Sequence, residues 1–281
     1  MKQEFPHLEI VDGWLLYEAL LFTSFYRNFF LKDFEFNSLE IGVHHWKFLI
    51  GIENITPLNG EVIAVDVFES QEKNIDKSGA GNLEIFNSHV ENFCKDPTRV
   101  VVRATDSLDI NPSEFGLNQF GLLSIDGGHT ANHTLHDLEI CNLLVSEAGL
   151  VILDDILNQD WVGVVTGAVQ YFSSNTGKRI VPFAIGYNKL FCCHFTAKQQ
   201  VLDVLFKYQN ELTEIGLKPF KLTEFAGHKV MSFKWTFFGW NFSGCQTVMF
   251  ESCFTSGWQT QFGLQINCKR YRASLWVRHH C

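Results

Sequence analysis

The chain has 281 residues, of which 46% are hydrophobic, and its formal net charge is −9. This length suits one large domain or one domain with an appendage, and the apolar fraction supports a sizeable core. The negative charge predicts no general attraction to nucleic acid or to an anionic membrane surface. No stretch reaches the roughly 18 uninterrupted apolar residues that a membrane-spanning helix requires.

The beginning of the chain lacks the charged-then-apolar pattern of a secretory signal. We therefore expect a cytoplasmic protein whose cysteines are free thiols. The eight cysteines contain no C-x-x-C pair, so no structural zinc site is expected. Cys192-Cys193-His194 lies in an apolar run, and adjacent strand residues point to opposite faces, which favours buried thiols over metal ligands.

Strand and helix patterns alternate along most of the chain. An aromatic-rich segment at about residues 1–36 has a helical pattern, and we interpret it as an N-terminal lid or cap. Strands are then predicted at 36–43, 61–67, 99–104, 120–125 and 150–153, with helices at 85–93 and 135–144. Continuous apolar strands are typical of a sheet that is buried on both faces. The alternation predicts an α/β domain with a doubly wound, mostly parallel, Rossmann-like sheet.

The pattern changes toward the end of the chain. Residues 180–183 and 189–193 predict two more strands at an antiparallel edge of the sheet, and residues 195–215 predict a helix. Beyond Gly227, Glu251 is the only acidic residue, and half of the cysteines gather there. We predict a cap at 1–36, a ligand-binding domain at 37–225 and an extension of undetermined structure at 226–281. The residues beyond Gly227 form either an extra β element or a segment packed on a partner.

Acidic residues stand where two predicted strands end. Asp126 follows the strand at 120–125, and Asp154 and Asp155 follow the strand at 150–153. Because the carboxyl ends of neighbouring parallel strands face one crevice, we expect the three carboxylates to meet there. Adjacent carboxylates repel one another unless a cation is present, and hard oxygen ligands suit Mg²⁺, Ca²⁺ or Mn²⁺. The alternative is a capping pair on a loop.

The end of the first strand indicates a second kind of ligand. The pattern G-x-G-x-x-G is missing after Gly42, because Val43 and His44 stand where small residues are needed, and this disfavours a pyrophosphate cradle. Glu40 fits a cofactor that carries a cationic group. Asp66 lies close to the offset of about 20 residues at which an acidic residue binds ribose hydroxyls. These residues predict a nucleoside-containing cofactor, with an ordinary turn at Gly42 and a helix cap at Asp66 as alternatives.

Other polar residues border the same predicted crevice. Thr105-Asp106-Ser107 follows the strand at 99–104, where it either contacts an adenine edge or caps a helix. His129 stands near the start of the next helix, where an imidazole can accept a proton at neutral pH, although a packing or surface role is the alternative. His133 and His136 are expected to be exposed on that helix. Trp161 is expected to wall a substrate pocket or to lie in the core.

In this order, the residues resemble the class I S-adenosylmethionine-dependent methyltransferases. The resemblance rests on Glu40-Ile41-Gly42, Asp66, Asp126-Gly127-Gly128-His129-Thr130 and Leu153-Asp154-Asp155, with similar linking segments at 65–75 and 182–190. More narrowly, the chain is similar to the metal-dependent small-molecule O-methyltransferases, which include the catechol, macrocin and aminocoumarin sugar enzymes. The likeness covers about residues 36–193.

The resemblance implies a role for each of these residues. Glu40 and Gly42 would face the methionine part of S-adenosylmethionine, Asp66 would face its ribose, and Asp106 and Ser107 would face its adenine. Asp126, which also borders the cofactor, would hold Mg²⁺ together with Asp154 and Asp155. His129 would take the proton from the acceptor. The chain departs from these relatives at Trp46, where they often keep a small residue. This indole is expected to narrow the methionine end of the site or to shape the acceptor pocket.

The expected function is therefore that of a cytoplasmic, Mg²⁺-dependent O-methyltransferase. Its acceptor would be a sugar or another polyhydroxylated small molecule, without nucleic acid or membrane as a partner, and a homo-oligomer is compatible with the sequence. The alternative on the same fold is a catalytically silent nucleoside-binding or scaffold protein. A nicotinamide-dependent oxidoreductase, which the missing glycines disfavour, and a metal-dependent hydrolase are further alternatives.

Overall fold

The computed structural model describes residues 10–11, 13–44, 47–174, 177–234, 250–253, 261–268 and 271–277. Trp46, which was expected to shape one end of the site, lies outside these residues. The chain divides into two compact units at residues 1–235 and 236–281. No helix within the described residues is long and apolar enough to cross a membrane.

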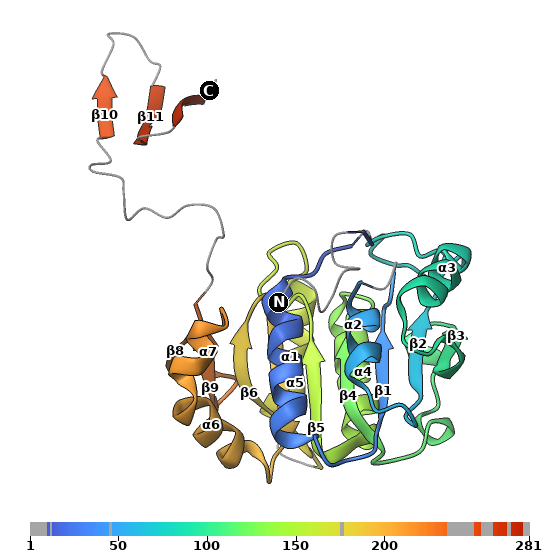
Figure 1. The fold of residues 1–281 in the computed structure, drawn as a ribbon. Coiled ribbons are helices and arrows are strands. Elements are labelled where there is room, and N and C mark those ends of the chain that lie inside the picture. Colours follow the sequence, from blue (N-terminus) through green and yellow to red (C-terminus); the bar gives the residue numbers. More distant parts are fainter. Residues whose placement is uncertain are drawn as a thin grey trace. The chain divides into compact units, whose positions relative to one another are not determined.

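The larger unit is built on a nine-stranded sheet with the order β3-β2-β1-β4-β5-β7-β6-β9-β8 (Figure 1). The strands are β1 Asn37–Ile41, β2 Val62–Asp66, β3 Val100–Ala104, β4 Phe120–Ile125, β5 Val145–Leu153, β6 Ile180–Gly186, β7 Lys189–His194, β8 Pro219–Phe225 and β9 His228–Phe233. Strands β1 to β5 are parallel to one another, whereas β7 runs antiparallel to both β5 and β6. The predicted doubly wound, mostly parallel α/β sheet with an antiparallel edge is confirmed.

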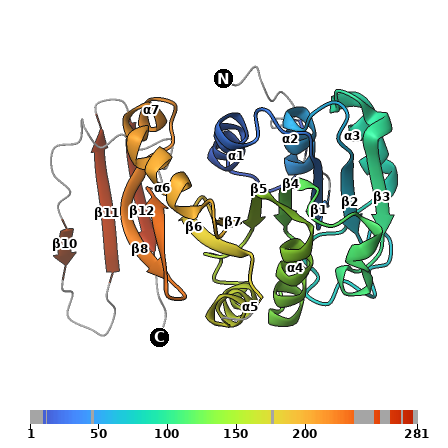
Figure 2. The same ribbon diagram turned by 90° about the horizontal axis from the view of Figure 1, so that it is seen from below.

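Helices cover both faces of this sheet. They are α1 Tyr17–Phe30, α2 Lys47–Ile55, α3 Leu83–Phe93, α4 Ala131–Leu144, α5 Val162–Ser173, α6 Lys198–Lys207 and α7 Gln209–Glu214. Helices α1 and α2 lie on one face, and α4 and α5 lie on the other (Figure 2). Phe22 of α1 packs in one apolar cluster with Phe183 and Phe191 of the sheet, whereas Leu138 of α4 belongs to a second cluster.

Adjacent residues of strand β7 point to opposite faces of the sheet, and both faces are buried. Cys192 packs in the cluster on the side of α4 and α5, and its neighbour Cys193 packs in the cluster on the side of α1. Both side chains are fully buried, and both are free thiols. The prediction of buried thiols on opposite faces is confirmed.

Of strands β8 and β9, the first was not predicted from the sequence, whereas an extra β element was one alternative for the residues beyond Gly227, where β9 lies. The two strands form a hairpin that extends the sheet beyond β6, and its turn contains Gly227 at φ +79°. The hairpin spans the predicted boundary between residues 225 and 226. In the smaller unit, β10 Phe250–Cys253, β11 Gln261–Cys268 and β12 Tyr271–Val277 form a three-stranded antiparallel sheet.

The strand order also positions a ligand site. The chain proceeds outward from β1 to β2 and β3 on one side, and β4 and β5 lie on the other side of β1. The order therefore reverses next to β1. In open α/β sheets, ligands bind outside the carboxyl ends of the strands at such a switch point.

Candidate functional site

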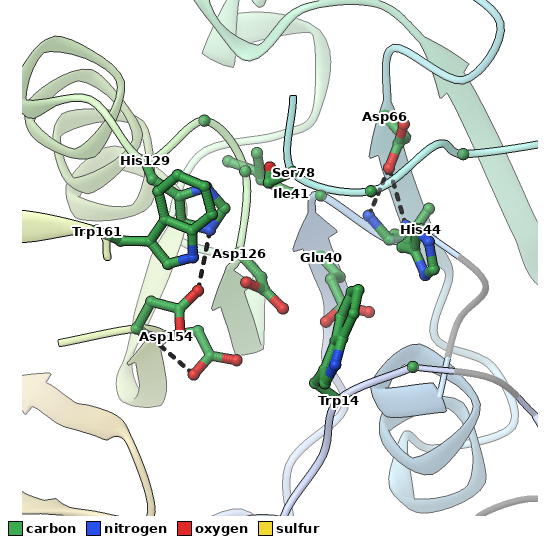
Figure 3. A pocket seen from close by; sticks show the side chains of 18 of the residues that line it. Trp14, Glu40, Ile41, His44, Asp66, Ser78, Asp126, His129, Asp154 and Trp161 are labelled. Atoms are coloured by element: carbon green, nitrogen blue, oxygen red, sulfur yellow. Dashed lines mark hydrogen bonds and ion pairs between the residues drawn. The ribbon is translucent and has the colours of Figure 1, made fainter. Parts of the chain in front are cut away.

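A cavity of about 720 Å³ lies at this switch point, which is a volume typical of small-molecule sites (Figure 3). Nine residues were predicted as site residues, and the structure brings all of them to its wall: Glu40, Gly42, Asp66, Asp106, Ser107, Asp126, His129, Asp154 and Asp155. They come from the carboxyl ends of β1, β2, β3, β4 and β5 and the segments that follow. The cavity is thus continuous from the predicted cofactor residues to the predicted metal ligands.

The turn after β1 is fixed by close packing and by Asp66. Gly42 has φ +81°, and a Cβ atom there would lie 2.0 Å from the carbonyl oxygen of Asp126, so no side chain fits. Asp66 Oδ2 accepts hydrogen bonds from the backbone N–H groups of Val43 and His44, each at 2.9 Å, and its Oδ1 accepts one from Phe68 at 2.7 Å. A carboxylate has about four acceptor positions, so Asp66 keeps room for one further hydrogen bond.

Glu40 presents a buried carboxyl group to the cavity. It is 2% exposed, and its Oε2 has no hydrogen-bond partner among the described residues. Burial raises the pKa of Glu40 to about 8, although the nearby Lys189 ammonium acts in the opposite direction. A buried polar atom without a partner is costly, so a cationic group of a ligand would complete this position. The residues at this end of the cavity therefore fit the amino group of a methionine moiety.

Asp106 was predicted either to contact adenine or to cap a helix, and the structure shows a cap. Its Oδ1 accepts a hydrogen bond from the backbone N–H of Leu108 at 3.0 Å and lies 3.5 Å from Nε2 of His133. The prediction that His133 is exposed is wrong, because it is 4% exposed. Its Nδ1 lies 2.7 Å from Thr130 Oγ1, and Gly128 packs so closely that a Cβ atom there would lie 2.8 Å from the imidazole. The loop after β4 therefore covers this histidine.

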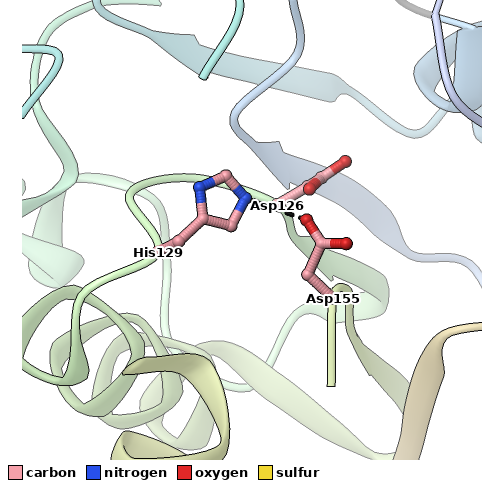
Figure 4. Close-up of side chains that lie close together, drawn as sticks. All are labelled: Asp126, His129 and Asp155. Carbon is pink, nitrogen blue, oxygen red and sulfur yellow. Dashed lines mark ion pairs between the residues drawn. The ribbon is translucent and has the colours of Figure 1, made fainter. Parts of the chain in front are cut away.

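The three predicted carboxylates have different partners. Asp154 Oδ2 forms a buried ion pair with Nζ of Lys189, whereas Asp155 Oδ2 lies 3.0 Å from Nε2 of His129. Asp126, His129 and Asp155 each offer one ligand atom, and these three atoms lie within 4.8 Å of one another (Figure 4). Burial, reinforced by the Asp154 carboxylate, raises the pKa of Asp126 well above its usual range. A divalent cation would stabilise the ionised carboxylates, so this donor set fits a metal ion.

His129 is held on both sides of its ring. Its Nδ1 and its backbone N–H lie 2.8 and 2.6 Å from Oδ2 of Asp76, and Trp161 stacks on the ring at a centroid distance of 4.5 Å. Burial lowers the pKa of His129, but the hydrogen bonds to Asp155 and Asp76 outweigh it, so the pKa lies above its usual value. Hydrogen bonds from Ser78 and His129 overcome burial and lower the pKa of Asp76 to about 2.

Four residues of this arrangement were not predicted. Asp76 stands 53 positions before His129, and no local pattern connects the two. Asn188 comes from the turn between β6 and β7, and Lys189 is the first residue of β7, where a lysine at the start of an apolar strand was the available signal. Trp14, which is 83% exposed, lies at the cavity with its ring 5.6 Å from that of His44 (Figure 3).

Comparison with known proteins finds a family match for part of the chain. Residues 39–156 match the family described as a methyltransferase domain, whereas no curated protein matches the chain. A crystal structure of a Corynebacterium glutamicum protein is 11% identical, with a TM-score of 0.51 over 69% of this chain and 90% of that chain. An O-methyltransferase from Bacillus cereus in complex with SAH is 18% identical, with a TM-score of 0.47 over 66% of this chain and 84% of that one.

The two kinds of comparison carry different weight. The likeness to the Corynebacterium protein shows a shared fold. The match of residues 39–156 to the methyltransferase-domain family confirms the prediction of an enzyme and supports S-adenosylmethionine as its cofactor.

Proposed function

We propose that this methyltransferase transfers a methyl group from S-adenosylmethionine to a hydroxyl group of a small-molecule acceptor, with the help of a bound divalent cation. The observation that carries the proposal is that one cavity is lined by two complementary sets of groups. Glu40 presents a buried oxygen that has no partner among the described residues, and Asp126, His129 and Asp155 gather at the end of the neighbouring strands. A methyl donor and an acceptor hydroxyl would thus lie side by side between them.

The cofactor end follows the roles implied by the resemblance. Glu40 would bind the cationic amino group of the methionine moiety, while Gly42 lets the backbone of the turn approach it. The remaining acceptor position of Asp66 suits a ribose hydroxyl. Asp106 and Ser107 line the part of the cavity that we assign to adenine.

The acceptor end would carry out the proton transfer. We assign Asp126 and Asp155 to the cation, for which Mg²⁺ is the ion that the resemblance implies; when bound, it would lower the pKa of the acceptor hydroxyl. With Asp155 held by the cation, its contact with His129 would be released, and Nε2 of His129 would accept the hydroxyl proton. Asp76 fixes the proton on Nδ1 and thereby the tautomer, while Trp161 holds the plane of the ring. Catalysis would rest mainly on this alignment and on charge neutralisation.

A sugar or another polyhydroxylated molecule is the acceptor class that we propose. Two vicinal hydroxyls would offer two oxygens to one cation, which fixes the orientation of the reacting hydroxyl. Trp14 and Trp161 both line the cavity and add flat apolar surfaces against which a ring can pack.

The experiment is a methyl-transfer assay with labelled S-adenosylmethionine and a panel of sugars and catechols, combined with calorimetric titration of S-adenosylhomocysteine. We expect cofactor binding and a labelled product that disappears on chelation and returns with Mg²⁺ or Mn²⁺. Product formation at an undiminished rate after chelation would refute the role of the cation. A protein that does not bind S-adenosylhomocysteine would refute the function itself.

A further inference from the structure

The turn between β6 and β7 reaches the carboxylates at the end of β5. Strand β7 runs antiparallel to β5, and Leu190 lies opposite Leu153. The residue before Leu190 therefore lies beside the residue after Leu153, which places Lys189 next to Asp154. Asn188, at φ +62°, makes the tight turn that precedes this contact.

The turn and the first residue of β7 give each of the two carboxylates its own partner. Lys189 Nζ pairs with Asp154 Oδ2, and these side chains are 3% and 10% exposed. The backbone N–H of Asp155 donates to Asp154 Oδ1 at 2.8 Å, so both oxygens of Asp154 are engaged. Asn188 Nδ2 donates to Asp155 Oδ1 at 2.6 Å, which leaves Asp155 Oδ2 facing His129 and the cluster.

Lys189 is a fixed positive charge in this site. Burial lowers its pKa, but the carboxylates of Asp154 and Asp126 raise it more, so the side chain remains an ammonium group. The ring of Phe48 lies 4.8 Å from Nζ and packs against this cation. Since like charges repel strongly at short range, an ammonium group and a divalent cation do not share the same carboxylate oxygen.

We propose that Lys189 is a positioning residue that keeps Asp154 outside the coordination shell of the divalent cation, so that Asp126 and Asp155 alone of the three strand-end carboxylates hold the ion. This inference rests on the proposed function, because it presupposes a cation at the cluster. Asp154 then acts as the counter-ion that anchors the β6–β7 turn to the site.

The test compares two neighbouring carboxylates by calorimetric titration of Mn²⁺. Asp154→Asn leaves the Lys189 charge unpaired and is expected to weaken Mn²⁺ binding, but clearly less than the matched variant Asp155→Asn, which weakens it by at least about tenfold. Equal losses in the two variants would overturn the inference.

A second pair of variants tests the lysine itself. Lys189→Met frees Asp154 and removes a repelling charge, so it is expected to bind Mn²⁺ at least about tenfold more tightly. Unchanged or weaker binding by the folded variant would contradict the proposal. The double variant Lys189→Met/Asp154→Asn avoids an unpaired buried charge, which makes it the test if the single variant does not fold. It is expected to bind Mn²⁺ like wild type, and a tenfold loss or more would show that Asp154 is a ligand.

The outcomes separate this inference from the function on which it rests. A wild-type protein that binds neither Mn²⁺ nor Mg²⁺ would refute the cation of the proposed function, and the inference with it. Wild-type binding together with equal losses in Asp154→Asn and Asp155→Asn would refute the inference alone.

Discussion

Binding of the cofactor is expected to release a proton from Glu40. This carboxyl group is buried, its Oε2 has no partner among the described residues, and its pKa is raised to about 8. At neutral pH most of the free protein therefore carries a protonated Glu40. The cationic amino group of the cofactor pairs with the ionised form, so the affinity should rise as the pH rises toward the pKa of Glu40.

The size of this effect follows from the pKa. Well below the pKa, each pH unit weakens the apparent affinity about tenfold, or about 1.4 kcal/mol. Between about pH 6 and about pH 7 the affinity for S-adenosylhomocysteine should thus increase almost tenfold, with the slope flattening near about pH 8. At about pH 7, close to one proton should leave the protein for each ligand bound.

Calorimetric titration in two buffers with different ionisation enthalpies measures both the affinity and the number of released protons. The range ends near about pH 8, where α-amino groups begin to titrate. Glu40→Gln is the control, because it is close in shape but cannot ionise; it should bind more weakly and with a flat pH profile. A flat profile in wild type, or the same slope in Glu40→Gln, would refute the pairing of Glu40 with the amino group.

Three further perturbations test other parts of the site. Asp76→Asn removes the carboxylate that orients His129, so kcat in steady-state assays should fall by about 10²-fold or more while S-adenosylhomocysteine affinity is retained; an unchanged kcat would contradict the role of His129. Gly216→Ala should lower the free energy of unfolding by about 1 kcal/mol, because Gly216 has φ +101° but open space around it. In Gly42→Ala the new Cβ atom would also meet the backbone of Asp126, so this variant should lower Tm further and abolish S-adenosylhomocysteine binding. Equal Tm shifts would show that the packing is unimportant. Mn²⁺ at about 100 times its Kd should stabilise the protein by about 2.7 kcal/mol in thermal denaturation, and chelation should remove this gain; a Tm that does not respond would argue against a cation site.

The residues at the strand ends could be predicted because parallel strands all end at the same edge of the sheet, so the residues that follow them lie close together. An apolar run that stops on Asp66 or Asp126 ends at the same edge of the sheet as its neighbours, whatever the connections are. The burial of β2 and β4 along their length made these runs visible in the sequence. Strand β8 gave no such signal, because most of its residues are exposed and its pattern is not apolar.

The partners of those residues could not be predicted, because they depend on contacts between distant segments. Asp76 reaches His129 across 53 positions, and Lys189 reaches Asp154 across 35. The burial of His133 could not be predicted either, although the segment that covers it is only a few residues away in the chain. Helical spacing predicts that a residue lies on a helix, but the loop at Gly128 decides whether its side chain is covered.

Some residues that stabilise the backbone conformation at this site also have a proposed role in binding or catalysis. His44 and Asp155 adopt positive φ angles of 46° and 56°, which are unfavourable for residues with side chains. Hydrogen bonds from the site offset this strain: Asp66 accepts from the backbone of His44, and Asn188 donates to Asp155. A variant such as Asp66→Ala therefore removes hydrogen bonds of the turn as well as the ribose contact. Weaker cofactor binding in that variant supports the ribose role only if Tm shows that the turn is retained.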